Sequence, residues 1–157
     1  MDNVSSIDAL DVRLIELLTT EPRIGVLEAS RRLQVARGTV QARLDRLVAS
    51  RVIRSFAPTL DPAALGYAVT AFVNLEIRQG ARSRVTDHLA AIPEVLEVHT
   101  ITGQGDLMCR LVARDNDDLQ RVIDVLVADD DVLRTATVVA LACVIAHRTL
   151  PLARAGS

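Results

Sequence analysis

The first fifty residues carry apolar positions at the spacing of an α-helix. One apolar stripe consists of Ile7, Leu10, Leu14, Ile15 and Leu18. It predicts a first helix with its N-cap at Ser6 and its end at Pro22. Two more amphipathic segments follow at about residues 25–33 and 37–50, with a tight turn at residues 33–35 between them. Three helices with a short second turn are typical of a helix-turn-helix unit.

The apolar side chains of these helices are expected to form a small core. The residues expected to be buried are Leu27 and Leu33 in the second helix, and Val40, Leu44, Leu47 and Val48 in the third. With Leu44 at the centre of the buried face, Thr39 and Arg46 point away from the core.

Beyond the third helix the apolar period falls to about two. Residues 52–58 are therefore predicted to form a linker strand. Asp61-Pro62 interrupts the pattern, and strict alternation begins after Gly66. The alternating sets are Tyr67, Val69, Ala71, Val73, Leu75 and Ile77, and Ala68, Thr70, Phe72, Asn74, Glu76 and Arg78. This alternation predicts a strand with one buried face.

The rest of the chain predicts a helix, two strands, another helix and a last strand. The helices are marked by Val85, Leu89 and Ile92, and by Leu119, Val122, Ile123 and Leu126. The strands are expected at about residues 95–102, 106–114 and 134–146. The resulting order, βαββαβ, predicts an α+β chain whose second domain is a ferredoxin-like sandwich with its helices on one face of the sheet.

Both alternating sets of the last predicted strand are apolar. They are Ala136, Val138, Ala140, Ala142 and Val144, and Val139, Leu141, Cys143 and Ile145. An antiparallel sheet with one solvated face should instead show polar alternation. The second face is therefore expected to be covered, and a copy of the same sheet in a two-fold dimer is the nearest candidate.

Charge is distributed unevenly along the chain. All 18 basic residues are arginines in a protein whose net charge is −2. Between Arg23 and Arg54 there are eight arginines against two acids, Glu28 and Asp45. A cationic helical pair on an acidic protein favours binding to a polyphosphate such as DNA.

Composition sets further bounds. At 157 residues and 50% hydrophobic, the chain can bury an aliphatic core in one or two domains. No apolar run predicts a signal peptide or a membrane span, which favours a cytoplasmic, nucleoid-associated protein without a membrane partner. Cys109 and Cys143 lie in apolar runs, so both are expected to be buried, reduced thiols.

Several short landmarks occur together in a fixed order. They are Ile7 to Asp11, Arg23-Ile24, Arg43, Arg46, Leu47, Leu60 to Pro62, Leu65-Gly66, Pro93 to Val95, Thr102-Gly103, Asp106 and Arg134 to Thr137. Their order and spacing resemble the Lrp/AsnC family of transcriptional regulators over nearly the whole chain. The resemblance implies a helix-turn-helix DNA-binding domain at residues 1–51 and a hinge strand and linker at 52–65. A ligand-sensing and oligomerisation domain at 66–150 and a tail at 151–157 complete the expected organisation.

The resemblance also implies partners. Members of this family form homodimers that assemble into tetramers or octamers, and bind amino-acid effectors in clefts between subunits. Three residues depart from the family pattern: Gln34 and Arg51 replace glycines, and Ala36 replaces a serine cap. Gln34 would have to adopt a left-handed conformation, at about 1 kcal/mol.

The candidate DNA-binding residues lie on the second and third helices. In a helix-turn-helix the outward N-terminal side of the third helix enters the major groove. Arg46 and Thr39 are assigned to base edges, with Gly38 beside them, and Arg37 and Arg43 to phosphates or the groove edge. Arg31 and Arg32 of the second helix are assigned to the DNA backbone. Any of these arginines could instead be a solvated surface residue, and Arg43 could form a structural pair with Asp11.

The candidate effector site is a glycine-rich loop formed by Thr102, Gly103, Gln104, Gly105 and Asp106. Its glycines permit positive φ and can expose amides to a carboxylate, while Asp106 could face an ammonium group. Thr135 and Thr137 are expected near the same cleft. His99 is close to the loop and could touch an effector, but it could also be a core or interface histidine. The loop could also be a plain hairpin turn without a ligand.

No catalytic or metal-binding set is evident, and no cofactor other than an amino-acid effector is expected. Two rival interpretations remain. Some sirohaem decarboxylases share this two-domain architecture, although the arginine-rich helices argue against an enzyme. A nucleoid-architectural protein would wrap DNA without responding to an effector.

Overall fold

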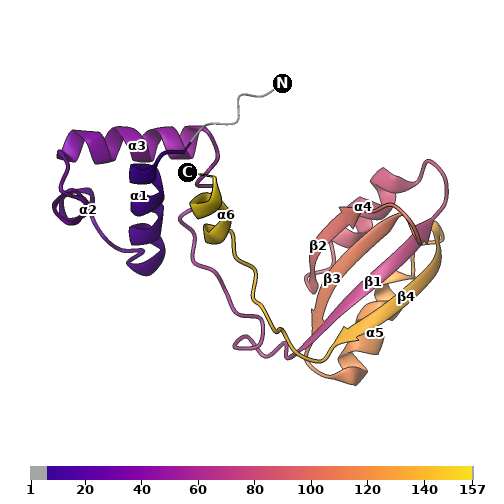
Figure 1. Cartoon of the computed structure of the whole chain (residues 1–157). Coiled ribbons are helices and arrows are strands. Elements are labelled where there is room, and N and C mark those ends of the chain that lie inside the picture. The colour runs from indigo at the N-terminus through magenta and orange to yellow at the C-terminus, as the bar shows by residue number, and fades with distance from the viewer. Residues whose placement is uncertain (1–6, 157) are drawn as a thin grey trace. The chain divides into compact units, whose positions relative to one another are not determined.

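The computed structural model describes residues 7–156 and divides the chain into two compact units. One unit, the head, contains the chain up to Pro58 together with the segment from Ile145 onward; the other, the sheet unit, spans Thr59–Val144. Figure 1 labels the elements of both units. The expected tail of the chain therefore belongs to the first unit and not to the second.

The head contains α1 (Ala9–Thr20), α2 (Val26–Leu33) and α3 (Arg37–Ala49), the three helices predicted from the sequence. Asp8 caps α1, and its carboxylate accepts the N–H groups of Leu10 and Asp11 in a capping box. The predicted cap, Ser6, lies outside the described residues. The core of the head consists of Leu14, Ala29, Leu33, Val40 and Leu47 with half-buried neighbours.

Two residues that were predicted to lie in the core are exposed. Leu27 is 51% exposed and Val48 is 43% exposed. At 100° per residue Leu27 lies about 120° around α2 from Leu33, so the two cannot share one narrow buried face. The buried face of α3 is centred on Val40 and Leu47, seven residues apart, which turns Val48 toward solvent.

The departures from the family pattern appear in the turn geometry. Gln34 adopts the left-handed conformation at φ 58°, as predicted, and Arg51 does so at the same φ. Ala36, at the N-cap of α3, makes no side-chain capping hydrogen bond. Such a cap contributes about 1 kcal/mol elsewhere.

The predicted linker strand at residues 52–58 is wrong, because this segment has no strand structure in the described chain. Its apolar alternation is real, but a strand also requires a partner for its backbone hydrogen bonds. Within the described residues this segment has none.

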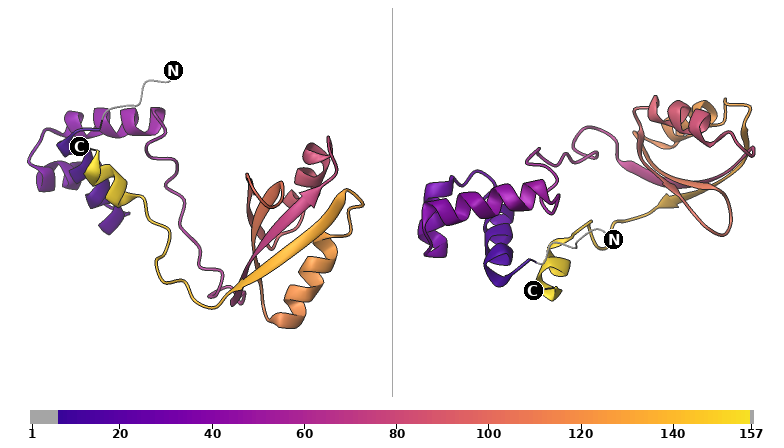
Figure 2. Two further views of the ribbon diagram at one scale, coloured as in Figure 1. Left: turned by 45° about the vertical axis from the view of Figure 1, so that its right-hand side comes forward. Right: turned by 90° about the horizontal axis from the view of Figure 1, so that it is seen from above.

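The sheet unit contains a four-stranded antiparallel sheet in the order β2-β3-β1-β4. Its strands are β1 (Val69–Ile77), β2 (Val95–Thr100), β3 (Leu107–Ala113) and β4 (Val132–Ala140). The helices α4 (Arg82–Ala90) and α5 (Asn116–Leu126) both lie on one face (Figure 2). This is the predicted ferredoxin-like sandwich.

The alternation of β1 decides which face is covered. Ala71, Val73 and Leu75 are fully buried beneath the helices, whereas Phe72 on the opposite face is 38% exposed. We call this opposite face the outer sheet face. On it, Phe72 pairs with Val138 of β4 and Arg110 of β3, and Asn74 pairs with Ala136 and Met108.

The last strand is shorter than the predicted 134–146. It ends at Ala140 because its ladder partner β1 begins at Val69, and Leu141 beyond it is 98% exposed. The chain then forms α6 (Leu150–Ala155), which was not predicted. In the head, Arg154 Nε of α6 lies 2.6 Å from Glu16 Oε1 of α1.

The two cysteines differ. Cys109 is fully buried on the helix-covered face, and burial raises the pKa of its thiol to about 11. Cys143 follows the end of β4 and is exposed, so its predicted burial was wrong.

Candidate nucleic-acid interface and effector pocket

The arginines of α2 are exposed but partly neutralised. Arg32 pairs with Glu28 at 3.1 Å and with Glu21 at 3.0 Å, and these acids raise the pKa of Arg32 above its usual range. Arg31 pairs with Glu28 at 3.5 Å. Exposed pairs of this kind are weak, at about 0–1 kcal/mol, so a phosphate can displace them.

The first two residues of α3 are accessible. Arg37 is exposed, and within the described chain it has no ion-pair partner. Gly38 is exposed, with no atom within 4 Å of the position that a Cβ would take. Together with Thr39, Ala42, Arg43 and Arg46, Gly38 lines a shallow hollow that Asp8 closes.

An ion cluster joins α1 to α3 beside this hollow. Arg43 Nη1 lies 2.6 Å from Asp8 Oδ2 and 3.0 Å from Asp11 Oδ1, and Arg46 Nη2 lies 2.5 Å from Asp11 Oδ2. Asp11 is completely buried, while Arg46 remains 45% exposed at its side chain. The structural pair between Arg43 and Asp11, considered from the sequence, is therefore confirmed.

Both carboxylates of the cluster are held in the charged form. The Arg43 guanidinium, followed by the N–H of Asp11, lowers the pKa of Asp8 to about 2. Burial would raise the pKa of Asp11, but the N–H of Asp8 and the guanidinium groups of Arg46 and Arg43 outweigh it and lower this pKa. Arg46 thus uses one guanidinium nitrogen to bind Asp11 of α1, while the rest of its side chain still lines the hollow.

The glycine-rich loop of the sheet unit is hydrogen-bonded to β1. Asp106 N–H donates to Leu75 O at 2.8 Å, and Asp106 Oδ2 accepts the N–H of Ile77 at 2.9 Å. Gly105 lies so close to β1 that a Cβ would be 3.0 Å from Leu75 O. Asp106 therefore anchors the loop, and one of its carboxylate oxygens is already used by the backbone.

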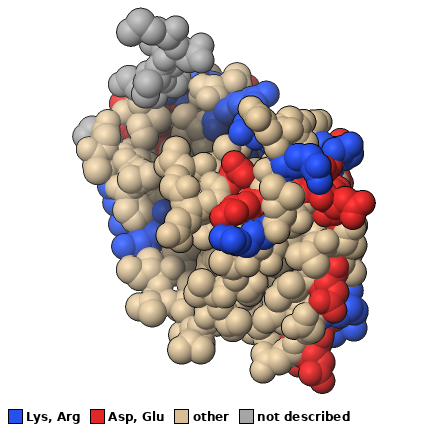
Figure 3. All heavy atoms as spheres, turned by 90° about the vertical axis from the view of Figure 1, so that its right-hand side faces the viewer, with Lys and Arg blue, Asp and Glu red and all other residues tan. Residues whose placement is uncertain are grey.

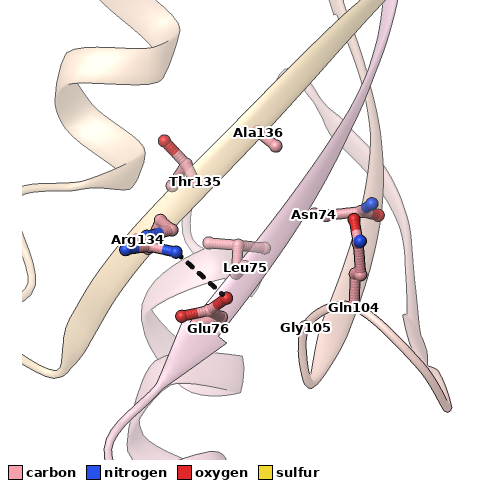
Figure 4. Close-up of a pocket in the computed structure, with 8 residues that line it drawn as sticks. All are labelled: Asn74, Leu75, Glu76, Gln104, Gly105, Arg134, Thr135 and Ala136. Atoms are coloured by element: carbon pink, nitrogen blue, oxygen red, sulfur yellow. Dashed lines mark ion pairs between the residues drawn. The ribbon is translucent and has the colours of Figure 1, made fainter.

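A pocket of about 380 Å³ lies between this loop and β4 (Figure 4). This volume falls within the range of about 300–1,000 Å³ that is common for small-molecule sites. The pocket is lined by Asn74, Leu75, Glu76, Gln104, Gly105, Arg134, Thr135 and Ala136. Its floor is β1, and its two walls are β4 and the loop.

The structure brings together only part of the predicted effector set. Gln104, Gly105 and Thr135 line the pocket. The predicted residues that do not line it are His99, Thr102, Gly103, Asp106 and Thr137. His99 lies 3.7 Å from Glu97 at the other edge of the sheet, and Thr137 pairs with Val73 of the helix-covered face.

Sequence reasoning missed Asn74, Glu76 and Arg134. A signal for the first two was present, because they are the polar members of the outward set in β1. Their convergence with Arg134 depends on the pairing of β1 with β4, which places Glu76 opposite Arg134. The ion pair between Arg134 Nη1 and Glu76 Oε1 measures 3.9 Å.

Charges elsewhere are mixed. On the face drawn in Figure 3, basic and acidic side chains lie next to each other around a broad uncharged area, with no large basic patch. Among residues 7–156, no group of three or more His, Cys, Asp and Glu residues could hold a metal ion. No helix of this part of the chain is long and apolar enough to cross a membrane.

The sequence matches two domain models. Residues 7–48 match the AsnC-type helix-turn-helix domain, and residues 70–150 match the Lrp/AsnC ligand binding domain. Among curated relatives, the HTH-type transcriptional regulator FL11 of Pyrococcus furiosus is 30% identical over 86% of this chain and 89% of its own length. The regulator AldR of Mycolicibacterium smegmatis is 32% identical over 83% of this chain and 79% of its own length.

Solved structures share the fold. E. coli AsnC has a TM-score of 0.85 at 24% identity, covering 92% of this chain and 99% of that one. A transcriptional regulator of Neisseria meningitidis in complex with L-methionine has a TM-score of 0.83, also at 24% identity, covering 93% and 97% of the two chains.

A helix-turn-helix head joined to this sandwich, in a chain whose relatives are named as HTH-type transcriptional regulators, defines a DNA-binding transcriptional regulator and not an enzyme. The chain belongs to the Lrp/AsnC family.

Proposed function

We propose that this regulator reads specific DNA sequences through α3 and responds to an amino acid bound in the pocket beside the glycine-rich loop. The single observation that carries the DNA-reading half is the hollow at the N-terminal end of α3. Gly38 and Thr39 line this hollow, Arg37 beside them in the sequence is exposed, and Gly38 has no side chain to keep a base edge away. Arg31, Arg32 and Arg43 contact phosphates, and Arg46 contacts a base edge from its exposed side.

The effector half rests on the pocket. It offers a carboxylate, a guanidinium and two amides within a volume suited to a small molecule. The L-methionine complex of the Neisseria meningitidis regulator supports an amino acid as the class of ligand.

We further propose that the protein acts as a homodimer that assembles into tetramers or octamers in the cytoplasm, in association with the nucleoid. The outer sheet face supports the dimer, because Phe72 and Val138 leave 38% and 65% of their surface exposed there. Exposed apolar surface on a sheet face is a typical protein–protein contact.

One experiment tests the proposed function. The purified protein is titrated against the DNA upstream of its own gene and against random DNA, at a stated salt concentration, with and without each standard amino acid. We expect preferential binding of the upstream fragment and a change in affinity with some amino acids. Equal affinity for both DNAs and no amino-acid response would support a nucleoid-architectural role instead.

A further inference from the structure

The pocket contains an ion pair that is poorly made as a structural contact. Glu76 and Arg134 are cross-strand neighbours on the outer sheet face, yet their charged atoms are 3.9 Å apart. Their side chains are 48% and 76% exposed. In the head, by comparison, Arg43 and Asp8 approach to 2.6 Å. An exposed pair at the limit of contact contributes about 0–1 kcal/mol at most, so little free energy opposes its opening.

A carboxylate and a guanidinium that are only weakly paired can together bind a zwitterion. A carboxylate accepts hydrogen bonds from an ammonium group, and a guanidinium donates two parallel hydrogen bonds to a carboxylate. Glu76 and Arg134 come from adjacent strands and border the same pocket, with their side chains turned toward each other (Figure 4). An amino acid placed between them would exchange one weak pair for two charge-assisted contacts.

The other end of the pocket is polar as well. Asn74 and Gln104, both with amide side chains, line the pocket (Figure 4). Asn74 is two residues from Glu76 on β1, a separation of about 7 Å, which a single amino acid with an extended side chain can span. An effector with an apolar side chain would desolvate these amides without giving them hydrogen-bond partners. Such an effector would therefore bind more weakly.

We propose that Glu76 and Arg134 receive the α-ammonium and α-carboxylate of the effector, and that Asn74 and Gln104 select a side chain with hydrogen-bonding groups. The effector class is then an amino acid such as glutamine or asparagine, and not an aliphatic one. This inference rests on the proposed amino-acid response and assigns its chemistry to residues of the pocket.

The test is calorimetric titration of the full-length protein with L-glutamine, L-asparagine, L-methionine and L-leucine. We expect the amide amino acids to bind at least about ten-fold more tightly than the aliphatic ones. Glu76→Gln and Arg134→Gln should each weaken L-glutamine binding by about ten- to a hundred-fold, the worth of a charge-assisted hydrogen bond.

A matched control pair lies on the same sheet face outside the pocket. Glu97 and Arg110 are cross-strand neighbours in β2 and β3, with their charged atoms 3.8 Å apart. Glu97→Gln, on the edge strand β2, should leave L-glutamine binding unchanged. Since Glu76 and Arg134 are exposed, their variants should keep the melting temperature of the parent protein, and Glu76→Asp should recover part of the affinity.

A ligand without the α-amino group gives an independent readout. Deaminated glutamine should bind the parent protein weakly and should bind Glu76→Gln no more weakly, because the same contact is absent in both cases. If amino acids bind but Glu76→Gln behaves like Glu97→Gln, or if L-methionine binds more tightly than L-glutamine, this assignment is overturned while the amino-acid response stands. If no amino acid binds at all, both proposals fail.

Discussion

The buried carboxylate of Asp11 in α1 lies 2.5 Å from Arg46 Nη2 in α3, the helix assigned to DNA. The same carboxylate lies 3.0 Å from Arg43 Nη1, so one acid holds two arginines of the DNA-facing helix. Because Asp11 is fully buried and capped into α1, the position of both guanidinium groups depends on the packing of α1 against α3.

Asp11→Asn should destabilise the head. The substitution removes the charge that Arg43 and Arg46 share but preserves shape, and both arginines are exposed enough to regain water. We expect a loss of about 1–3 kcal/mol, the usual range for a lost hydrogen bond to a charged group. Chemical denaturation followed by circular dichroism measures it, with the exposed Asp45→Asn as the control. An unchanged midpoint would show that the cluster does not stabilise the fold.

Arg46→Ala and Arg31→Ala should affect DNA binding differently. Arg46→Ala should weaken binding to the specific site by about 1–3 kcal/mol, with a smaller effect on random DNA, because a base contact discriminates. Arg31→Ala should weaken both equally and reduce the salt slope by about 1. Binding isotherms at several salt concentrations distinguish them. Equal losses on specific and random DNA for Arg46→Ala would exclude a reading role.

Lowering the pH should weaken the ion cluster that joins α1 to α3. The pKa of Asp8 falls from its ordinary 3.8 to about 2 in the folded head, so its stabilising effect is fully present above pH 3.8. It is lost as the pH falls from there through about 2, because the unfolded state then binds the proton first. Between pH 6 and about 2, the free energy of unfolding should fall more steeply for the parent protein than for Asp8→Asn. Parallel curves for the two proteins would contradict this.

Gly105→Ala should disturb the effector loop more than Gly103→Ala. Both glycines have positive φ, 96° and 101°, which is unfavourable for alanine by about 1–2 kcal/mol. Only at Gly105 does the added Cβ also meet a backbone atom, Leu75 O at 3.0 Å. We therefore expect the larger fall in melting temperature, and the larger loss of effector binding, for Gly105→Ala. Identical effects would mean that the close approach to β1 is not restrictive.

The periodicity of apolar residues was enough to predict an element wherever that element buries one apolar face against one core. The alternation that begins after Gly66 predicted a strand with one buried face, and the structure has β1 there with Ala71, Val73 and Leu75 inaccessible. The left-handed conformation of Gln34 was expected from the family resemblance, because Gln34 replaces a glycine of the family pattern. These are local properties, and the sequence states them directly.

Other predictions were wrong where the local apolar pattern did not agree with the strand pairing. Residues 52–58 alternate like a strand but find no partner within the described chain, and β4 stops at Ala140 although apolar residues continue. Thr135 and Thr137 were both expected at the cleft, but only Thr135 lines the pocket. Thr135 pairs with Leu75, which accepts the N–H of Asp106 in the loop, whereas Thr137 pairs with Val73, two positions farther along β1.

The sequence alone determined the helices α1 to α5, the four strands of the sheet and the arginine-rich helices, because each follows from the spacing of side chains along a short stretch of chain. Only the tertiary structure decided that Asp11 holds Arg43 and Arg46, that Asp106 serves as an anchor, and that Glu76 faces Arg134 across the pocket. Those contacts join residues that are 29 to 58 positions apart, and only the register of the sheet and the packing of the helices bring them within bonding distance.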